Sequence, residues 1–543
     1  MSQAQVIVDL FAADGQASLF HNREGETFAT FLVGDHRETW PTGSRRFRRH
    51  LQWLYYRASM ETARSTSVAE AQATLEAHAL YEGAQQEVYT RIAGDGIDVV
   101  YVDLCDDEWR VVEISVSART FRVLDDSPVR FVRAQGMLAL PMPEHGGNLL
   151  ALRQLLNLAD DGDWALVLAW LVAALRPIGP YPILLVHGEQ GTAKSMLVRI
   201  IRRFVDPSRA DLRAEPRNTR DLAIAASNAW VMGFDNLSSI EPWLSDALCR
   251  LSTGGGFATR QLYTDREEAI FDSKRPVVLT GIEEIATRGD LIDRCISVEL
   301  QPIPEAGRKT ESEIWAAVNA SAGRIFGALL DAVAHALRAH RDLRLPALPR
   351  MADFATWATA AEPGLGLPTG AVMAAYQGNR AAVNQTVLES SPTAALVIAL
   401  VREQGVWSGT ATELLRVMEG RADDWARRGK GWPRTARAMA GALRRVAPNM
   451  RKAGIRIEFS RAAGQDRQRV ITMSMAPPHA LEPSAEPPKI VGKCPQATSD
   501  DGRATTGDGP TGSSDNRAKE GEASDDPDGS DDVAGAFLED VEI

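Results

Sequence analysis

The chain has few cysteines, no long apolar run and no secretory signal. Its four cysteines lie far apart among 543 residues and form no C-x-x-C pair. This spacing argues against a disulfide framework and against a zinc site, and it favours a reducing compartment. The longest apolar stretch, residues 164–175, is too short to cross a bilayer and is typical of a buried helix. We therefore expect a cytoplasmic protein that makes no membrane contact.

The net charge of −12 is concentrated at the end of the chain. Residues 476–543 hold 5 Lys/Arg and 16 Asp/Glu, with much Pro, Gly and Ser and little apolar content. This composition predicts a disordered acidic tail. Residues 401–475 have the opposite balance, with 16 Lys/Arg and 7 Asp/Glu. A basic block followed by an acidic tail is an indication of nucleic-acid binding.

Changes in hydrophobic period divide the remainder into domains. Helices near 44–56 and from Ser67, where Ser67 and Glu70 form a capping-box pattern, precede short β-rich runs between 88 and 133. They predict a small mixed α/β accessory domain over 1–147. Strand–loop–helix units then predict a parallel α/β sheet within 148–310. We expect helices over 311–390, and three helices followed by two strands over 391–475.

The stretch GEQGTAKS, from Gly188 to Ser195, almost fits the phosphate-binding pattern G-x-x-x-x-G-K-[ST]. An apolar strand precedes it and a helix follows, so backbone N–H groups, a helix dipole, a lysine and a hydroxyl converge on one place. Ala193 replaces the last glycine, which is tolerable if its φ is negative and its methyl group points away from the phosphate. The alternative is a glycine turn with a surface lysine. The predicted ATP-binding residues are Gly188, Glu189, Gln190, Gly191, Thr192, Ala193, Lys194, Ser195 and Met196.

The next apolar strand, 229–235, ends in a candidate metal ligand. We predict that Asp235 holds Mg²⁺ together with Ser195. Asn236 stands where a carboxylate usually activates the attacking water, and an amide can orient water but cannot accept its proton. Hydrolysis is therefore slow, or another carboxylate such as Glu283 or Glu284 assists.

Two further polar residues are candidate catalytic groups. Thr280 ends the third apolar strand, 275–281, where a polar side chain could sense the γ-phosphate. Arg294 follows 14 residues later, in LIDRCISVEL. An arginine so placed could stabilise transition-state charge, or it could be an ordinary surface arginine.

Taken together, GEQGTAKS, MGFDN, STGGGFATRQLYTD, VVLTG and LIDRCISVEL resemble the ATPase of phage and mobile-element primase–helicases. These ATPases belong with the superfamily 3 branch of AAA+ ring motors, and the resemblance covers about residues 150–300. It implies a P-loop AAA+ core, ATP and Mg²⁺ as cofactors, and a homo-oligomer, expected to be a hexamer. In that ring Arg294 would act on the neighbouring subunit's nucleotide. The sequence departs from the family at Asn236 and at Thr280, where asparagine is more usual.

The resemblance also implies a DNA-gripping β-hairpin just before the third strand. The runs 261–263 and 269–271 flank a charged tip, DREE, and fit this form. A solvated hairpin is the alternative, because Glu267 and Glu268 at the tip would repel phosphate. The candidate DNA contacts here are Arg260, Arg266, Lys274 and Arg275. A primase module, which the resemblance implies upstream, is not found, so a separate primase or replication protein is left open as a partner.

The basic block predicts a second DNA-binding element, a winged helix over 391–475. Apolar residues recur at helical spacing from Ala436 to Val446, and a two-stranded wing follows. A winged helix that contacts protein is the alternative. The predicted DNA contacts are Arg434, Arg437, Arg444, Arg445 and Arg461. The N-terminal stretch SRRFRRH, 44–50, is either a further phosphate contact or a solvated helix end.

These features lead to one expected function and one alternative. We expect an ATP-dependent DNA helicase or translocase that acts on single-stranded or forked DNA in the replication of a phage or mobile element. The alternative is an ATP-binding DNA switch or loader with little ATP turnover, which Asn236 favours.

Overall fold

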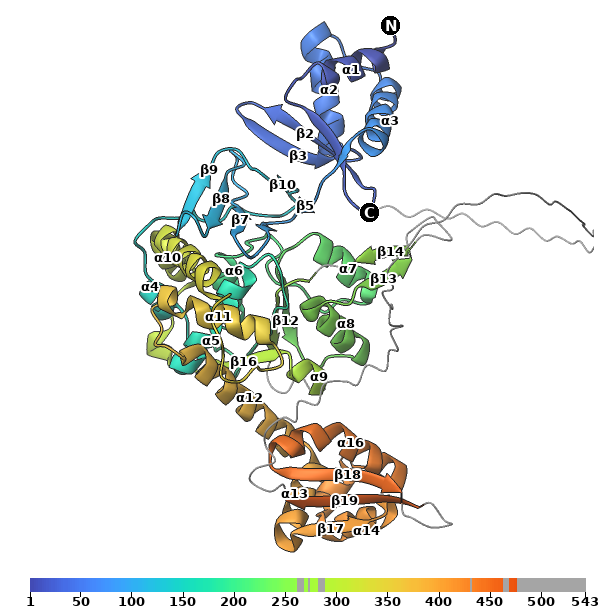
Figure 1. The fold of residues 1–543 in the computed structure, drawn as a ribbon, viewed down its shortest axis with the longest axis vertical. Helices are drawn as coiled ribbons and strands as arrows, with labels where there is room; N and C mark the ends of the chain where they lie inside the picture. The colour runs from blue at the N-terminus through green and yellow to red at the C-terminus, as the bar shows by residue number, and fades with distance from the viewer. Residues whose placement is uncertain (261–267, 272–273, 282–288, 430–431, 462–467, 476–543) are drawn as a thin grey trace, which may run out of the picture. The chain divides into compact units, whose positions relative to one another are not determined.

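The computed structural model describes residues 1–260, 268–271, 274–281, 289–429, 432–461 and 468–475. The acidic tail predicted over 476–543 therefore lies outside the described residues. The chain begins with a module of three helices and a small sheet (Figure 1). Its elements are α1 (Gln3–Ala12), β1 (Ser18–His21), β2 (Thr27–Val33), β3 (His36–Pro41), α2 (Arg45–Ser59), α3 (Ser65–Tyr81) and β4 (Ala84–Gln85), with strand order β3-β2-β1-β4.

The hydrophobic core of this module is its own. Alternate residues of β2, Ala29 and Phe31, pack against Phe47 and Leu51 of α2. Helix α2 begins at the predicted place, with the Ser44 hydroxyl accepting a hydrogen bond from the Phe47 N–H. The capping box predicted at Ser67 is wrong, because α3 begins at Ser65 and has no side-chain cap.

The β-rich stretch that follows forms a second sheet, with the order β6-β7-β8-β9, and a short parallel pair, β10-β5. The strands are β5 (Val88–Tyr89), β6 (Ile92–Gly94), β7 (Val99–Asp103), β8 (Val111–Ser115), β9 (Phe121–Leu124) and β10 (Arg130–Phe131). Buried residues such as Val100 and Leu140 share one core with Trp170 and Leu184 of the next segment. The hydrophobic core of this segment is therefore continuous with that of the next, and the domain boundary near 147 stays a prediction.

The predicted parallel α/β sheet is confirmed. Four parallel strands have the order β12-β15-β11-β16, so β11 lies in the middle of the chain's central sheet. Alternate residues of β11 pack into two hydrophobic cores, one on each face of the sheet. Leu184 and Val186 belong to the first core, and Ile183 belongs to the second. Both faces are thus covered, as parallel sheets require. The elements are α4 (Leu150–Leu155), α5 (Asp161–Ala174), β11 (Ile183–His187), α6 (Lys194–Arg202), α7 (Thr219–Ser227), β12 (Met232–Leu237), α8 (Pro242–Thr253), β15 (Val277–Gly281), α9 (Gly289–Ile292) and β16 (Cys295–Glu299).

A two-stranded antiparallel hairpin precedes β15. Its strands are β13 (Phe257–Arg260) and β14 (Glu268–Phe271), paired from Phe257 with Phe271 to Arg260 with Glu268. The second strand lies where the sequence predicted it, and the predicted first run, 261–263, lies outside the described residues. The tip, 261–267, lies outside the described residues.

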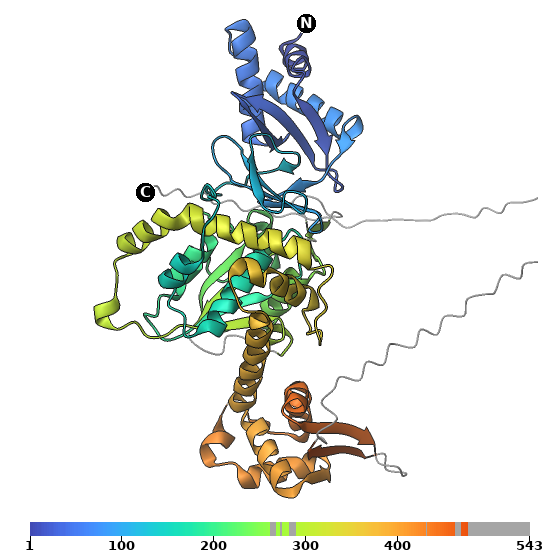
Figure 2. The ribbon, with the colours of Figure 1, turned by 60° about the vertical axis from the view of Figure 1, so that its left-hand side comes forward.

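Three helices follow, as predicted for 311–390: α10 (Glu311–Ala339), α11 (Ala352–Leu365) and α12 (Ala371–Ser390). Helix α10 begins with a complete capping box, in which Thr310 and Glu313 satisfy each other's backbone N–H. It is the long yellow helix in Figure 2, and its apolar side, including Phe326 and Leu330, joins the core of the central sheet.

The last described segment combines helices with a three-stranded antiparallel sheet, order β17-β19-β18. Its elements are α13 (Pro392–Gln404), β17 (Val406–Gly409), α14 (Ala411–Arg421), α15 (Asp424–Arg428), α16 (Ala436–Lys452), β18 (Ile455–Arg461) and β19 (Arg469–Met475). The two strands predicted at its end are present, and β17 is an addition that the sequence analysis missed. Within the described residues, no helix has the length and hydropathy needed to span a bilayer.

Candidate nucleotide-binding site

The 188–195 loop connects the carboxyl end of β11 to the first turn of α6. Gly188 has φ 146° and Gly191 has φ 85°, values that favour glycine. A Cβ at Gly188 would lie 2.7 Å from the Leu300 carbonyl oxygen, so no side chain fits there, whereas a Cβ at Gly191 would meet nothing within 4 Å. The loop backbone therefore turns tightly against Leu300, the residue after β16, and is open at Gly191.

Ala193 adopts a conformation that the sequence analysis did not expect. Its φ is +66° and its ψ is 32°, in the left-handed region, so the condition of a negative φ is wrong. The Cβ of a non-glycine residue costs about 1–2 kcal/mol there. The turn into α6 keeps the backbone shape that a glycine would give, and the alanine bears the strain.

The polar groups predicted for the site do converge. The Lys194 ammonium donates hydrogen bonds to the carbonyls of Gly188 and Glu189, both at 2.8 Å, which holds its charge against the start of the loop. The Ser195 hydroxyl lies 3.0 Å from each carboxylate oxygen of Asp235. A hydroxyl at a helix N-terminus beside an acid that ends the neighbouring strand is a donor set suited to Mg²⁺.

Thr280 serves Asp235 in this structure. Its side chain is buried, its hydroxyl donates to the Asp235 carboxylate, and it accepts a hydrogen bond from the Asn236 N–H at 2.9 Å. In this arrangement Thr280 positions the acid, and its role as a sensor of the γ-phosphate stays a prediction.

Asn236 has a backbone reason for its identity. It is exposed and its φ is 54°, in the left-handed region, where asparagine and aspartate are enriched among non-glycine residues. Glutamate at this position would have to adopt the same strained backbone. The left-handed backbone therefore disfavours glutamate at 236 but not aspartate, and it coincides with the irregularity of β12, whose pairing with β15 shifts register between Phe234 and Leu237. Glu283 and Glu284 lie outside the described residues.

Asn157 is a site residue that the sequence analysis missed. Its amide nitrogen donates to the Thr192 carbonyl at 3.3 Å and to the Gln301 carbonyl at 2.5 Å. It thus ties the loop to the chain that leaves β16. No motif marks this residue, because the contact joins segments far apart in the sequence.

Arg294 lies at the opposite end of the sheet from the loop. Its carbonyl accepts a hydrogen bond from the N–H of Ile183, the first residue of β11, whereas the loop follows the last. Five residues of strand separate them, about 16 Å. Its guanidinium pairs with Asp290 at 2.5 Å. Burial would raise the pKa of Asp290, but hydrogen bonds from Arg294 and Arg350 outweigh it and lower the pKa to about 2.

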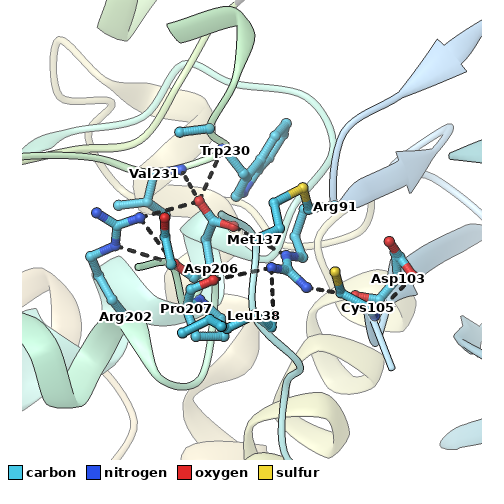
Figure 3. Close-up of polar contacts among 12 residues, drawn as sticks. Arg91, Asp103, Cys105, Met137, Leu138, Arg202, Asp206, Pro207, Trp230 and Val231 are labelled. Carbon is cyan, nitrogen blue, oxygen red and sulfur yellow. Dashed lines mark hydrogen bonds and ion pairs between the residues drawn. The ribbon is translucent and has the colours of Figure 1, made fainter. Parts of the chain in front are cut away.

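A buried ion-pair network fixes the base of β12 (Figure 3). The Asp206 carboxylate accepts hydrogen bonds from the N–H groups of Trp230 and Val231, both at 3.0 Å, just before β12 begins. Arg202 of α6 lies 3.4 Å from the same carboxylate, and Arg91 pairs with it at 3.1 Å. The network joins the helix after the loop to the strand that carries Asp235.

The candidate DNA contacts near the hairpin differ in accessibility. Arg275 is buried, and its guanidinium donates to the carbonyls of Ala226 and Ala229 and lies over the Trp230 ring. Burial lowers its pKa to about 10. The predicted phosphate contact is therefore wrong for Arg275, which holds the sheet to α7. Lys274 is half-buried. Arg266 lies outside the described residues, and for Arg260 only the backbone is described.

The candidate contacts in the C-terminal segment are all exposed. Met439, Leu443 and Val446 of α16 are buried as predicted, and Arg437, Arg444 and Arg445 project from the other side of the helix. A groove between α16 and the β18–β19 pair is lined by Arg437, Arg444, Arg461 and Arg469 together with apolar residues such as Phe459. Arg444 lies 4.7 Å from the Phe459 ring centroid. Arg434 is also exposed.

Within the part of the chain that the structure describes, no three His, Cys, Asp or Glu side chains come close enough to form a metal site. A metal at Asp235 would therefore need ligands from a bound phosphate, which is how Mg²⁺ is usually held.

The solved structures that the chain resembles include three of the NrS-1 C terminal region, each with low identity and a low TM-score. The A form apo structure of the NrS-1 C terminal region is 9% identical, covers 87% of this chain and 99% of that chain, and has a TM-score of 0.37. A second A form apo structure of this region is 10% identical over 87% and 98%, with a TM-score of 0.38. A third, apo structure is 9% identical over 88% and 100%, with a TM-score of 0.37. No curated protein matches the chain.

Family models give a more direct result. The model of the actinomycete integrative conjugative element replication protein matches residues 149–387, which hold the central sheet and its helices. The model of the C-terminal domain of the same family, AICE RepA, matches residues 393–488. The two matches are consecutive and together cover more than half of the chain. The chain therefore belongs to the family of replication proteins of actinomycete integrative conjugative elements.

Proposed function

We propose that this chain is an ATPase that binds MgATP at the 188–195 loop and acts on DNA during replication of a mobile element. The observation that carries the proposal is the convergence of Lys194, Ser195 and Asp235 at one end of the central parallel sheet. Its family membership places it in replication, and the site supplies a chemistry for that role.

The residues present fit a nucleotide. Gly188 leaves no room for a side chain beside Leu300, and Gly191 is open, so the loop backbone can approach a phosphate closely. The N-terminus of α6, a helix of nine residues, points its unpaired N–H groups at the same place. Lys194 would contact the phosphates, and Ser195 and Asp235 would hold Mg²⁺. Bound ATP would supply the hydrolysable phosphate bond.

We propose that the chain acts as an oligomer, and the position of Arg294 supports this proposal. Arg294 lies about 16 Å along β11 from the 188–195 loop, so it is not part of the nucleotide site of its own chain. A role on nucleotide would require a neighbouring copy, and we propose a ring, a hexamer by resemblance to AAA+ motors. Arg294 would first exchange its contact with Asp290 for the neighbour's phosphate.

Two elements support the DNA-binding part of the proposal. The β13–β14 hairpin projects from the central sheet just before β15, in the place where related motors grip DNA. The C-terminal helices and three-stranded sheet have the composition of a winged helix, with exposed arginines on α16 beside a groove. We propose that this winged helix recruits DNA and that movement of the hairpin makes the chain a helicase or translocase.

The second candidate function is an ATP-binding switch or loader with little turnover. Asn236 favours it, because no carboxylate stands at the position beside Asp235 where water would be activated. In this role ATP would stabilise a DNA-bound or assembled state without being consumed rapidly.

The deciding experiment measures both binding and turnover. Full-length protein is titrated with a fluorescent ATP analogue, and phosphate release is followed with and without single-stranded DNA. The helicase proposal expects DNA-stimulated release, and the switch expects binding with little release. Lys194→Ala should abolish both signals, while the exposed Lys309→Ala serves as the matched control. Equal nucleotide binding by Lys194→Ala and wild type would refute both functions.

Replacement of Asn236 tests where water is activated. Asn236→Asp supplies a carboxylate and tolerates the left-handed backbone, whereas Asn236→Glu supplies a longer one at a backbone cost of about 1–2 kcal/mol. If the missing base limits hydrolysis, at least one of them should release phosphate faster than wild type. No gain from either would mean that the base comes from elsewhere.

A further inference from the structure

The outer face of α2 carries exposed aromatic and basic side chains together. Arg45, Arg49, Trp53, Tyr56 and Arg57 are all exposed and recur at spacings of three, four and one residues, so they form one face of the helix. Trp53 is 48% exposed and Tyr56 is 50% exposed, which is high for large aromatic side chains. We call these five residues the α2 outer face. It lies in the N-terminal module, outside the residues that match the family models.

The helix that presents this face is firmly anchored. Phe47, Leu51 and Tyr55 on the opposite side are buried in the core of the module. Burial of one side is enough to hold an amphipathic helix in place, so the aromatic residues of the outer face are not needed for the fold. They remain half exposed after the core is complete, and they call for a different explanation.

The charge of the face is positive and largely uncompensated. Helix α2 contains five arginines and no acidic residue. Arg46, beside the face, is paired with Glu38 at 2.9 Å, and Arg48 contacts the Ser65 carbonyl. Among the described residues, Arg45 and Arg49 form no ion pair. The free positive charge therefore lies on the outer face, where it can attract a polyanion.

The Trp53 ring is held in one orientation. The Arg57 guanidinium lies 5.2 Å from its centroid, and the His50 ring packs beside it at 5.8 Å with an interplanar angle of 31°. Tyr56 is one turn along the same side. Two half-exposed rings flanked by arginines, of which Trp53 is held in place, make a platform on which unpaired bases can stack while phosphates contact the arginines.

We propose that the α2 outer face is a binding site for single-stranded nucleic acid, separate from the nucleotide site and from the C-terminal segment. From Arg45 to Arg57 it extends about 18 Å along the helix axis. Bases stack on Trp53 and Tyr56, and Arg45 and Arg49 contact the backbone. Duplex DNA is a poorer ligand for this face, because its bases are already stacked within the helix.

The proposal does not depend on ATP hydrolysis, and its test uses no nucleotide. Binding of full-length protein to a fluorescein-labelled single-stranded oligothymidine is measured by anisotropy over a range of salt concentrations. The measurement is repeated in an Arg437→Ala/Arg444→Ala background, so that DNA binding by the C-terminal groove does not conceal the effect. A duplex of the same length is measured in parallel.

The expected results separate stacking from charge. Trp53→Ala/Tyr56→Ala should weaken oligothymidine binding about tenfold or more and affect the duplex much less. Trp53→Phe/Tyr56→Phe should keep most of the binding, because the rings remain. Arg45→Ala/Arg49→Ala should lower the slope of log K against log salt by about 1.4. Matched controls in the same module are Tyr81→Ala, an 82% exposed tyrosine at the end of α3, and Arg23→Ala, an exposed arginine in the β1–β2 turn.

Two results would overturn the proposal. In the first, the alanine double variant binds oligothymidine within twofold of the Tyr81→Ala control in both backgrounds. In the second, the variant changes sedimentation of the free protein while DNA binding stays the same, which would make the face a protein contact. A melting curve accompanies each variant; if the alanine pair unfolds, the phenylalanine pair and the arginine pair decide. Failure here with intact DNA-stimulated phosphate release would leave the proposed function standing.

Discussion

Replacing Arg91 with methionine removes the buried guanidinium that joins the N-terminal β-rich segment to the central sheet (Figure 3). The Arg91 and Asp206 side chains are both almost fully buried and lie 3.1 Å apart. Arg91 also donates to the carbonyls of Asp103 at 3.1 Å, Leu138 at 2.9 Å and Pro207 at 3.3 Å. Methionine fills much of the same volume and offers none of these donors.

The expected loss of stability depends on the hydrogen bonds and ion pairs that Asp206 keeps when the Arg91 guanidinium is removed. Breaking a buried ion pair on one side typically costs about 3–5 kcal/mol, because the remaining charge is left without compensation. Asp206 keeps Arg202 and two backbone N–H donors, so we expect the lower end, about 3 kcal/mol. Arg91 has a left-handed backbone, φ 65°, and methionine would be strained there to the same extent. This strain therefore does not contribute to the difference in stability between wild type and variant. A domain of this size loses about 2–4 °C per kcal/mol, so the melting temperature should fall by about 6–12 °C.

The assay is urea and thermal unfolding of the single variants and of a double variant. Asp206→Asn keeps an acceptor for Trp230 and Val231 while removing the charge. Arg91→Met/Asp206→Asn should therefore lose less than the sum of the single variants, by at least about 1 kcal/mol. Arg427→Met, at an ion pair with Asp424 in which both side chains are exposed, should melt like wild type. A loss below about 1 kcal/mol for Arg91→Met, with additive effects in the double variant, would refute the reasoning.

Three further predictions concern single residues. Ala193→Gly should raise the free energy of unfolding by roughly 1 kcal/mol, because glycine adopts a φ of +66° without strain; a lower melting temperature would contradict this. Arg275→Met should destabilise the protein by about 2 kcal/mol or more and leave oligonucleotide affinity unchanged, because the Arg275 guanidinium donates to buried carbonyls. Weaker DNA binding at equal stability would instead support the phosphate contact that the sequence predicted for Arg275. Burial lowers the pKa of His50 from 6.5 to about 4, so the unfolded chain takes up its proton first. The contribution to stability is complete above about pH 6.5 and falls as the pH drops toward 4, and denaturation midpoints at pH 7 and pH 5 should differ less for His50→Phe than for wild type.

Much of the site could be predicted because its parts are close together in the sequence. Strand β11, the 188–195 loop and α6 occupy consecutive residues, and glycine, lysine and serine have defined roles at fixed offsets. Asp235 could be placed because apolar strands end at the same edge of a parallel sheet. The exposed arginines of α16 followed from helical periodicity.

The remaining features depended on contacts that no local pattern records. Thr280 could be placed at the end of β15, but its hydrogen bonds to Asp235 and Asn236 needed the two strands side by side. Asn157 reaches the loop from a segment 35 residues earlier. The short strand β17 had a signal, since Val406 and Trp407 follow a glycine, but a run of four residues is weak evidence without its partner β19.

The sequence by itself determined the order of strand, loop and helix from β11 to α6, the place of the phosphate-type loop, and the identity of most of the groups that converge on it. Those properties arise from backbone preferences and from periodicity over a few residues. Only the tertiary structure decided which charged residues are accessible. Arg275 is buried under Trp230, Arg91 is enclosed by carbonyls from three segments, and Arg45 and Arg49 remain on the surface. Burial and pairing depend on neighbours that lie tens to hundreds of residues away, and the same arginine side chain is a structural tie in one place and a candidate nucleic-acid contact in another.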